Sequence, residues 1–83
     1  MAIELARRNI RVNVISPGLV KTDMTEKAFS LLSGAQVKAM EEAYPLGTGT
    51  PEDVARAAVF LLAPQNRWIT GIDLTVDGGY TAK

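Results

Sequence analysis

Apolar residues recur along this chain with two different periods, which divide it into predicted strands and helices. Ile10 to Ser16 is almost continuously apolar and rich in β-branched residues, which predicts a strand buried on both faces, as in parallel sheets. Ile72 to Val76 alternates apolar and polar residues, which predicts a half-buried strand. Pro51 to Ala63 is predicted to be a helix that is apolar on nearly all sides, because Arg56 is its only charged residue after the first turn.

Residues typical of helix ends stand at both boundaries of this apolar helix. Thr50 suits the N-cap and Pro51 the first helical position, and the acidic Glu52 and Asp53 follow in the first turn. We therefore interpret these two carboxylates as helix caps and not as catalysts. Pro64 is predicted to end the helix. Burial on all sides would require two partners, which we expect to be the sheet and a second subunit.

A short helix is predicted at the start of the chain, over Met1 to Arg8, with apolar residues on one face. Asn9 then suits the left-handed residue that ends a helix. Asn13 is expected to satisfy nearby backbone groups rather than to catalyse a reaction. Trp68, in the turn before the last strand, is interpreted as a packing residue.

Residues 23–44 are predicted to form two amphipathic helices. Apolar residues recur at helical spacing in this segment, and Asp23 or Thr25 is available as an N-cap. Ser33-Gly34 is expected to separate the two helices, and Pro45 to end the second. One interpretation is that both helices cover a face of the sheet.

Composition narrows the class of protein. A chain of 83 residues supports one domain with a thin core, although 47% of its residues are hydrophobic. Nine basic residues balance nine acidic ones, which disfavours binding to nucleic acid or to an anionic membrane. Cysteine and histidine are both absent, so a zinc or copper site is not expected. No membrane span or secretion signal is recognised, and we expect a cytoplasmic protein.

The segment from Asn13 to Thr22 joins the first strand to a turn. Pro17 is expected to stop the sheet ladder, and Gly18 allows the backbone to turn tightly or to approach a ligand. Ligands of open parallel α/β sheets bind beyond the carboxyl ends of the strands. The turn is therefore predicted to face a ligand; the alternative is a turn that only ends a strand.

Three ordered motifs resemble the C-terminal part of the short-chain dehydrogenase/reductase family, and together they span essentially the whole chain. They are Asn-Val-Ile-Ser-Pro-Gly-Leu-Val-Lys-Thr-Asp-Met at 13–24, Pro-Glu-Asp-Val-Ala at 51–55 and Ile-Thr-Gly-Ile-Asp-Leu-Thr-Val-Asp-Gly-Gly at 69–79. The resemblance implies an α/β fold, a fragment of the doubly wound, Rossmann-like parallel sheet with two parallel strands and connecting helices. Residues 1–83 would form a single domain, completed by oligomerisation.

The same resemblance implies a nicotinamide cofactor, NAD or NADP. Pro17 and Gly18 would shape the turn beside the nicotinamide, and the backbone of Val20 would meet its carboxamide. Thr22 would hydrogen-bond the carboxamide or the pyrophosphate. Residues 23–44 would form a mobile lid over the substrate, which is the second interpretation of that segment.

The catalytic motifs of this family do not occur in these 83 residues. Thr48 stands four positions after Tyr44, and Lys83 only three after Tyr80, so Tyr-x-x-x-Lys is absent, as is the glycine-rich Thr-Gly-x-x-x-Gly-x-Gly. We therefore expect no catalytic residue here, and weak or no cofactor binding by the isolated chain. The catalytic tyrosine and lysine of the family's Tyr-x-x-x-Lys motif would have to be supplied by another segment.

Two hypotheses follow. The chain is the C-terminal segment of an NAD(P)-dependent oxidoreductase that is inactive alone, or it is a free-standing module that associates with itself or another partner without catalysis. We expect a homo-oligomer formed through the helix Pro51–Ala63, the strand Ile72–Val76 and the open edge of Ile10–Ser16.

Overall fold

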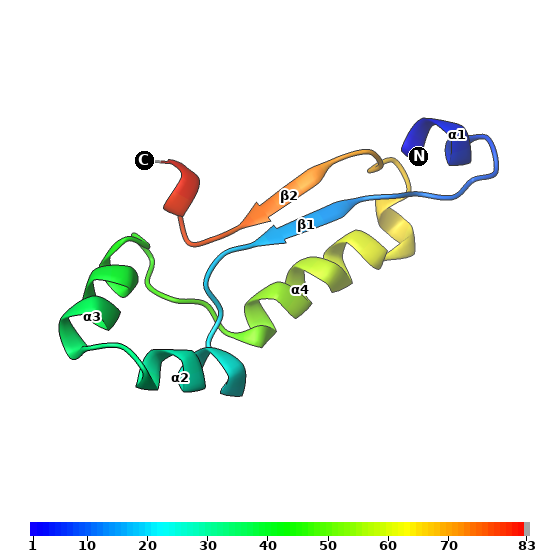
Figure 1. Ribbon diagram of the computed structural model, residues 1–83. Coiled ribbons are helices and arrows are strands. Elements are labelled where there is room, and N and C mark those ends of the chain that lie inside the picture. The colour runs from blue at the N-terminus through cyan, green and yellow to red at the C-terminus, as the bar shows by residue number, and fades with distance from the viewer. Residues whose placement is uncertain (83) are drawn as a thin grey trace.

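The computed structural model describes residues 1–82, which form a two-stranded parallel sheet with four helices, and Lys83 lies outside the described residues. Figure 1 shows the sheet lying along α4, with α1 at one end and α2 and α3 at the other. The predicted α/β class with two parallel strands is confirmed. The elements are α1 (Ala2–Ala6), β1 (Val14–Pro17), α2 (Asp23–Ser30), α3 (Gly34–Glu42), α4 (Pro51–Leu62), β2 (Asp73–Val76) and 3-10 turns at Pro64–Asn66 and Tyr80–Ala82.

The register of the sheet places Pro17 opposite Val76 at its end. The N–H groups of Val14 and Gly18 donate to β2, at 2.9 Å to Ile72 O and 3.0 Å to Val76 O. Alternate residues of a strand direct their N–H groups to opposite edges, so position 17 faces the edge away from β2. Pro17 is therefore the last residue of the strand, and no β1–β2 hydrogen bond is lost to its ring.

The first strand begins at Val14 and not at Ile10 as predicted. Just before it, side chains add to a single backbone bond from Gly71 N to Val12 O: Thr70 Oγ1 accepts from Val12 N at 3.0 Å, and Asn13 Oδ1 accepts from Ile72 N at 3.2 Å. Asn13 Nδ2 also donates to Ile69 O at 3.1 Å, which confirms that Asn13 satisfies backbone groups. The predicted burial on both faces is not reached in this chain, since Val14 is 54% exposed.

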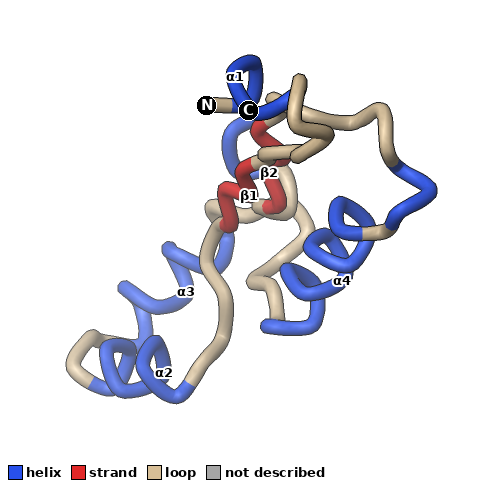
Figure 2. Tube along the Cα trace, turned by 90° about the vertical axis from the view of Figure 1, so that its right-hand side faces the viewer, coloured by secondary structure: helices blue, strands red, loops and turns tan. Residues whose placement is uncertain are grey.

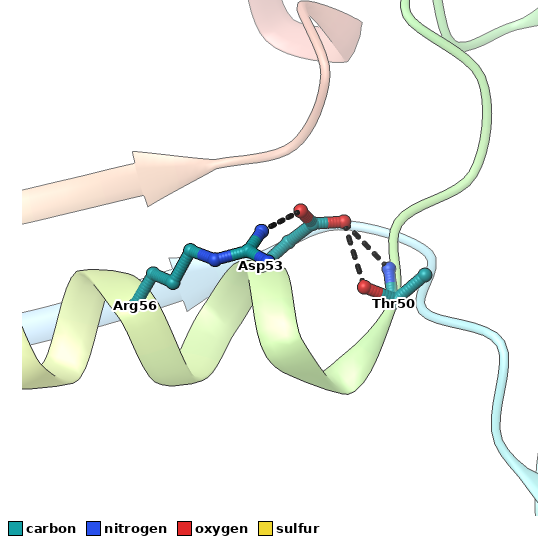
Figure 3. A network of polar contacts seen from close by, with 3 residues as sticks. All are labelled: Thr50, Asp53 and Arg56. Atoms are coloured by element: carbon teal, nitrogen blue, oxygen red, sulfur yellow. Dashed lines mark hydrogen bonds and ion pairs between the residues drawn. The ribbon is translucent and has the colours of Figure 1, made fainter.

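The N-terminus of α4 is capped as predicted. The Asp53 carboxylate accepts from Thr50 N at 2.8 Å and from Thr50 Oγ1 at 3.1 Å, and its other oxygen lies 3.4 Å from the Arg56 guanidinium (Figure 3). Pro51 occupies the first turn, and the helix ends at Leu62, before Pro64. The carboxylate therefore serves the helix, in agreement with its interpretation as a cap.

The apolar sides of α4 are only partly covered. Leu61 is the one core residue below a tenth exposed among residues 1–82, while Val59 is 68% exposed and Leu62 77% exposed. One side of the helix lies under the sheet, and the covering of its other side by a second subunit stays a prediction. None of the helices in the described part of the chain is long and apolar enough to cross a membrane.

Helices α2 and α3 form an arm, residues 23–42, that extends away from the sheet (Figures 1 and 2). The main packing between elements in the described chain joins the sheet, α4 and the 3-10 turn after α4, and neither α2 nor α3 takes part in it, so the interpretation that these helices cover a sheet face is wrong. The N-cap of α2 is Thr22, and neither of the predicted caps Asp23 and Thr25 has that position. Ser33 is the N-cap of α3, which begins at Gly34.

The predictions for two turn residues, Asn9 and Trp68, have different outcomes. Asn9 has a φ of 61° directly after the first helical turns, which confirms its left-handed conformation. Trp68 is 92% exposed, so its interpretation as a packing residue is wrong among the residues described. The turn that carries it bonds mainly through backbone groups, and Ile69 rather than Trp68 meets the side chains of Arg11 and Asn13.

Candidate functional site

The turn at residues 17–22, called here the β1 turn, leaves the sheet at the carboxyl ends of both strands. Gly18 begins it at a point where the backbone is tightly enclosed. A Cβ on Gly18 would lie 2.8 Å from Asp77 Cβ and 2.8 Å from Tyr44 Cε1, closer than real Cβ atoms approach. Glycine is therefore required here by the close approach of other segments, and not by an unusual φ.

A parallel bridge to Gly49 holds the middle of the β1 turn. Leu19 O accepts from Gly49 N, and Lys21 N donates to Gly49 O, both at 2.9 Å. The two backbone groups of Val20 consequently face the other side. Val20 O accepts from Thr25 Oγ1 at 3.0 Å, whereas Val20 N–H donates to no group within residues 1–82. This N–H is the donor that the turn leaves available.

Thr22 ends the turn and caps α2. Its Oγ1 accepts from Thr25 N at 3.2 Å, and Thr25 Oγ1 accepts from Thr22 N at 2.7 Å, which is a reciprocal capping box. The Thr22 hydroxyl lies 3.4 Å from Thr25 Oγ1, a weak contact for its proton. The hydroxyl can thus cap the helix as an acceptor and still donate to a ligand.

The role of Thr25 was missed by the sequence-based prediction. Its hydroxyl lies 3.0 Å from Val20 O and 2.9 Å from Thr22 O, so it ties the β1 turn to the first turn of α2. The signal was the Thr-x-x-Thr spacing from Thr22, in which threonine takes the place that glutamate or glutamine has in the usual capping box. Asp23 occupies the first position of the helix instead of its cap.

The four predicted site residues, Pro17, Gly18, Val20 and Thr22, all lie in the β1 turn because they are close in the sequence. A backbone donor at Val20 and a hydroxyl at Thr22 suit an amide or another small polar group. Neither residue can transfer a proton near neutral pH. In the described part of the chain, no three His, Cys, Asp or Glu side chains gather closely enough to hold a metal ion.

Asp77 stands behind the turn, against Gly18. Its carboxylate accepts from Gly79 N at 3.1 Å, from Thr81 N at 3.0 Å and from the Thr81 hydroxyl at 2.8 Å. The Thr81 hydroxyl is the largest cause that lowers the pKa of the Asp77 carboxyl, the two N–H donors act in the same direction, and desolvation opposes them. The role of this ionised carboxylate is to order the backbone that follows β2.

Comparison with protein families places almost the whole chain in one of them. Residues 1–81 match the family model described as enoyl-(acyl carrier protein) reductase. A 3-oxoacyl-(acyl-carrier-protein) reductase of Chlamydia pneumoniae is 46% identical over 82 residues, which are 98% of this chain and 32% of that protein. An inactive 2-(S)-hydroxypropyl-CoM dehydrogenase 2 of Xanthobacter autotrophicus is 45% identical, over 99% of this chain and 37% of the relative. The chain spans about a third of the length of the curated relatives it matches.

Solved structures give the same result for the fold. A 4-hydroxyisoleucine dehydrogenase complexed with NADH superposes with a TM-score of 0.88 at 39% identity, over 100% of this chain and 34% of that one. A putative 2-deoxy-D-gluconate 3-dehydrogenase from Agrobacterium tumefaciens with bound NADP gives 0.87 at 41% identity, over 99% and 33%. A putative short-chain dehydrogenase/reductase from Burkholderia xenovorans gives 0.91 at 33% identity, over 99% and 32%.

Substitution of Gly18 by alanine should destabilise the fold around the β1 turn. Because the new Cβ would overlap Asp77 and Tyr44, we expect the free energy of unfolding to fall by about 1–3 kcal/mol, as measured by urea denaturation. Gly34→Ala is the matched control: a Cβ there meets nothing within 4 Å, in the first turn of α3. It should be neutral or stabilising by about 0.4–1 kcal/mol. Equal effects of the two changes would contradict the close approach.

Acid should weaken the fold through two carboxyls. The pKa of Asp77 is lowered, and hydrogen bonds from Thr50 N and Oγ1 lower the pKa of Asp53. A lowered folded pKa stabilises the fold above the unfolded value, and this stability is lost as pH falls through the folded pKa. We expect thermal stability, followed by circular dichroism, to decline below a pH of about 4. Asp77→Asn and Asp53→Asn should each flatten that decline; unchanged profiles in both would disprove this account.

Proposed function

This chain belongs to the short-chain dehydrogenase/reductase family, and we propose that residues 1–83 form the C-terminal part of an NAD(P)-dependent oxidoreductase and supply the nicotinamide side of its cofactor site. The observation that carries the proposal is the β1 turn. It stands at the carboxyl end of a parallel strand, where ligands of such sheets bind, and it presents the Val20 N–H without an internal acceptor.

Each predicted site residue has a separate task in the proposed site. Pro17 and Gly18 shape the turn beside the nicotinamide, and the Val20 N–H donates to the carboxamide oxygen. Thr22 donates its hydroxyl to the carboxamide or to the pyrophosphate while its lone pairs continue to cap α2. These groups bind and orient a cofactor, and the proton transfer belongs to residues that this segment lacks.

Two further observations support the assignment to part of an enzyme. The chain matches about a third of its curated relatives, and the 83 residues contain neither Tyr-x-x-x-Lys nor the glycine-rich motif. Similar structures are complexes with NADH or NADP, which supports a nicotinamide cofactor for the complete site. We therefore propose that hydride transfer requires this chain together with a segment that supplies those two motifs, and that the isolated chain does not reduce carbonyl compounds.

A chimera tests this proposal. The matching third of the related 3-oxoacyl-(acyl-carrier-protein) reductase is replaced by this chain, and cofactor affinity and reductase activity are measured with NADH and NADPH. We expect the chimera to bind and oxidise reduced cofactor. Thr22→Val should weaken cofactor binding by about two- to tenfold, which corresponds to one lost hydrogen bond of about 0.5–1.5 kcal/mol.

Two companion variants separate the ligand contact from the helix cap. Thr22→Ser keeps both functions of the hydroxyl and should bind cofactor as the parent does. Thr22→Asp keeps the cap, since aspartate is a good N-cap, but it cannot donate and should bind cofactor weakly with unchanged thermal stability. Tight binding by the aspartate variant, or turnover by the isolated 83-residue chain, would refute the proposed site.

A second proposal, self-association of the chain, is favoured by the exposed apolar side of α4. Val59, Phe60 and Leu62 are 68%, 51% and 77% exposed on a helix whose other side lies under the sheet. We propose that a second copy covers this side, with the outer edge of β2 and the open edge of β1 as further contacts. Leu61 is the one buried hydrophobic residue among residues 1–82, so a second copy would add apolar burial that the single chain has little of, which supports such an assembly.

Sedimentation of the purified chain at high micromolar concentration tests the assembly. We expect a mass that is a multiple of 8.9 kDa. Val59→Lys should shift it toward the monomer, because burial would desolvate the new charge. Leu31→Lys is the control, since Leu31 is 87% exposed on the arm, outside the proposed contacts. A monomeric parent chain, or equal effects of the two lysines, would contradict self-association through α4.

A further inference from the structure

Three segments that are distant in the sequence converge behind the β1 turn. Gly18 meets Asp77, the first residue after β2, and Tyr44, which follows α3. The ring of Tyr44 stacks on the ring of Tyr80, with centroids 4.7 Å apart and planes inclined by 27°. The start of the β1 turn, the end of the arm and the C-terminal turn therefore share one contact point.

Backbone contacts reinforce this convergence. Leu46 N donates to Gly78 O at 2.9 Å, a Cβ on Gly78 would lie 3.1 Å from Gly47 O, and Gly79 lies against the ring of Pro45. Residues 44–47 and 77–80 thus run close together over several positions. The Asp77 carboxylate orders the second of these segments through its bonds to Gly79 and Thr81.

The arm has few other attachments in the described chain. Its first end is tied by the Val20–Gly49 bridge and by Thr25, and its second end by the contacts of residues 44–47. Between these ends, α2 and α3 make no substantial packing contact with the sheet or with α4 (Figure 1). The direction in which the arm leaves the fold must therefore be set at its two ends.

We infer that Tyr44 and Tyr80 form a latch, by which the C-terminal turn fixes the second end of the arm and thereby its position relative to the β1 turn. Tyr80 is a positioning residue in this arrangement, because it acts through Tyr44 and Gly18. A cavity of 160 Å³ lined by Leu19, Met40, Ala43 and the two tyrosines lies at the same place, so the latch also sets the shape of the space beside the turn.

The latch depends only on contacts within the chain. The latch would also hold the β1 turn and the arm at a fixed spacing around a bound nicotinamide. This consequence rests on the function proposed above. Experiments without cofactor therefore test the latch separately: a failure of cofactor binding leaves it standing, and a failure of the latch leaves the β1 turn a candidate cofactor site.

Tyrosine crosslinking tests the contact directly, because Tyr44 and Tyr80 are the only tyrosines of the chain. Photo-oxidation with a ruthenium complex and persulfate joins two adjacent phenol rings, each of which loses one hydrogen atom to the oxidant. We expect dityrosine within single chains, located by mass spectrometry of the joined peptides and absent from Tyr44→Phe and Tyr80→Phe. Crosslinks only between chains, or none, would overturn the latch.

Hydrogen exchange tests the positioning role. Loss of the stacked ring in Tyr80→Ala should speed exchange at the amides of residues 44–50 and of the β1 turn by about two- to tenfold, the effect of one aromatic contact. Exchange at the buried side of α4 should not change. Tyr80→Phe keeps the stacked ring and should therefore exchange at these amides more slowly than Tyr80→Ala.

The remaining outcomes of the exchange experiment count against the latch. Equal exchange in Tyr80→Ala and in the parent chain would show that the stack positions nothing. A uniform increase along the whole chain would show that Tyr80 only stabilises the fold. Rapid exchange throughout the parent chain, at residues 44–50 as well as α4, would show that the latch does not form in solution.

Discussion

The contact between a strand end and the backbone that follows its neighbour is the constraint on which this structure depends. Strands β1 and β2 run parallel, so the chain leaves both of them at the same end of the sheet. Two departing backbones can share that space only if one residue carries no side chain, and that residue is Gly18. The position of the β1 turn, of Asp77 and of the end of the arm all follow from this close approach.

Hydrogen bonds of polar side chains hold together many of the segments that a larger protein would hold together by packing in its core. Arg11, Asn13 and Thr70 add to the ladder hydrogen bonds at the start of the sheet, and Asp53 and Thr25 close the first turns of α4 and α2. Each of these bonds is local or joins two neighbouring loops, and each contributes modestly in water. Buried apolar packing adds little to them, since Leu61 alone among the described residues is nearly covered.

The exposed apolar surface links the family assignment with the two proposals on function. Members of this family that are similar to the chain are about three times as long, and the matched part here carries a turn suited to a cofactor but not the family's Tyr-x-x-x-Lys motif. The exposed apolar surface supports both the completed enzyme and the self-associating module.

Local patterns in the sequence were sufficient for the element types and the capped start of α4, because capping and hydrophobic period act between residues close in sequence. The parallel α/β class was implied by the resemblance of three motifs to a family. Local patterns did not predict that β1 begins at Val14, since this depends on the bonds of Thr70 to Val12 and of Asn13 to Ile72 across the fold. They also did not predict the exposure of Trp68, the free-standing arm or the Tyr44–Tyr80 stack. Those features join residues that are far apart in the chain, and only the tertiary structure decides which distant surfaces meet and which remain uncovered.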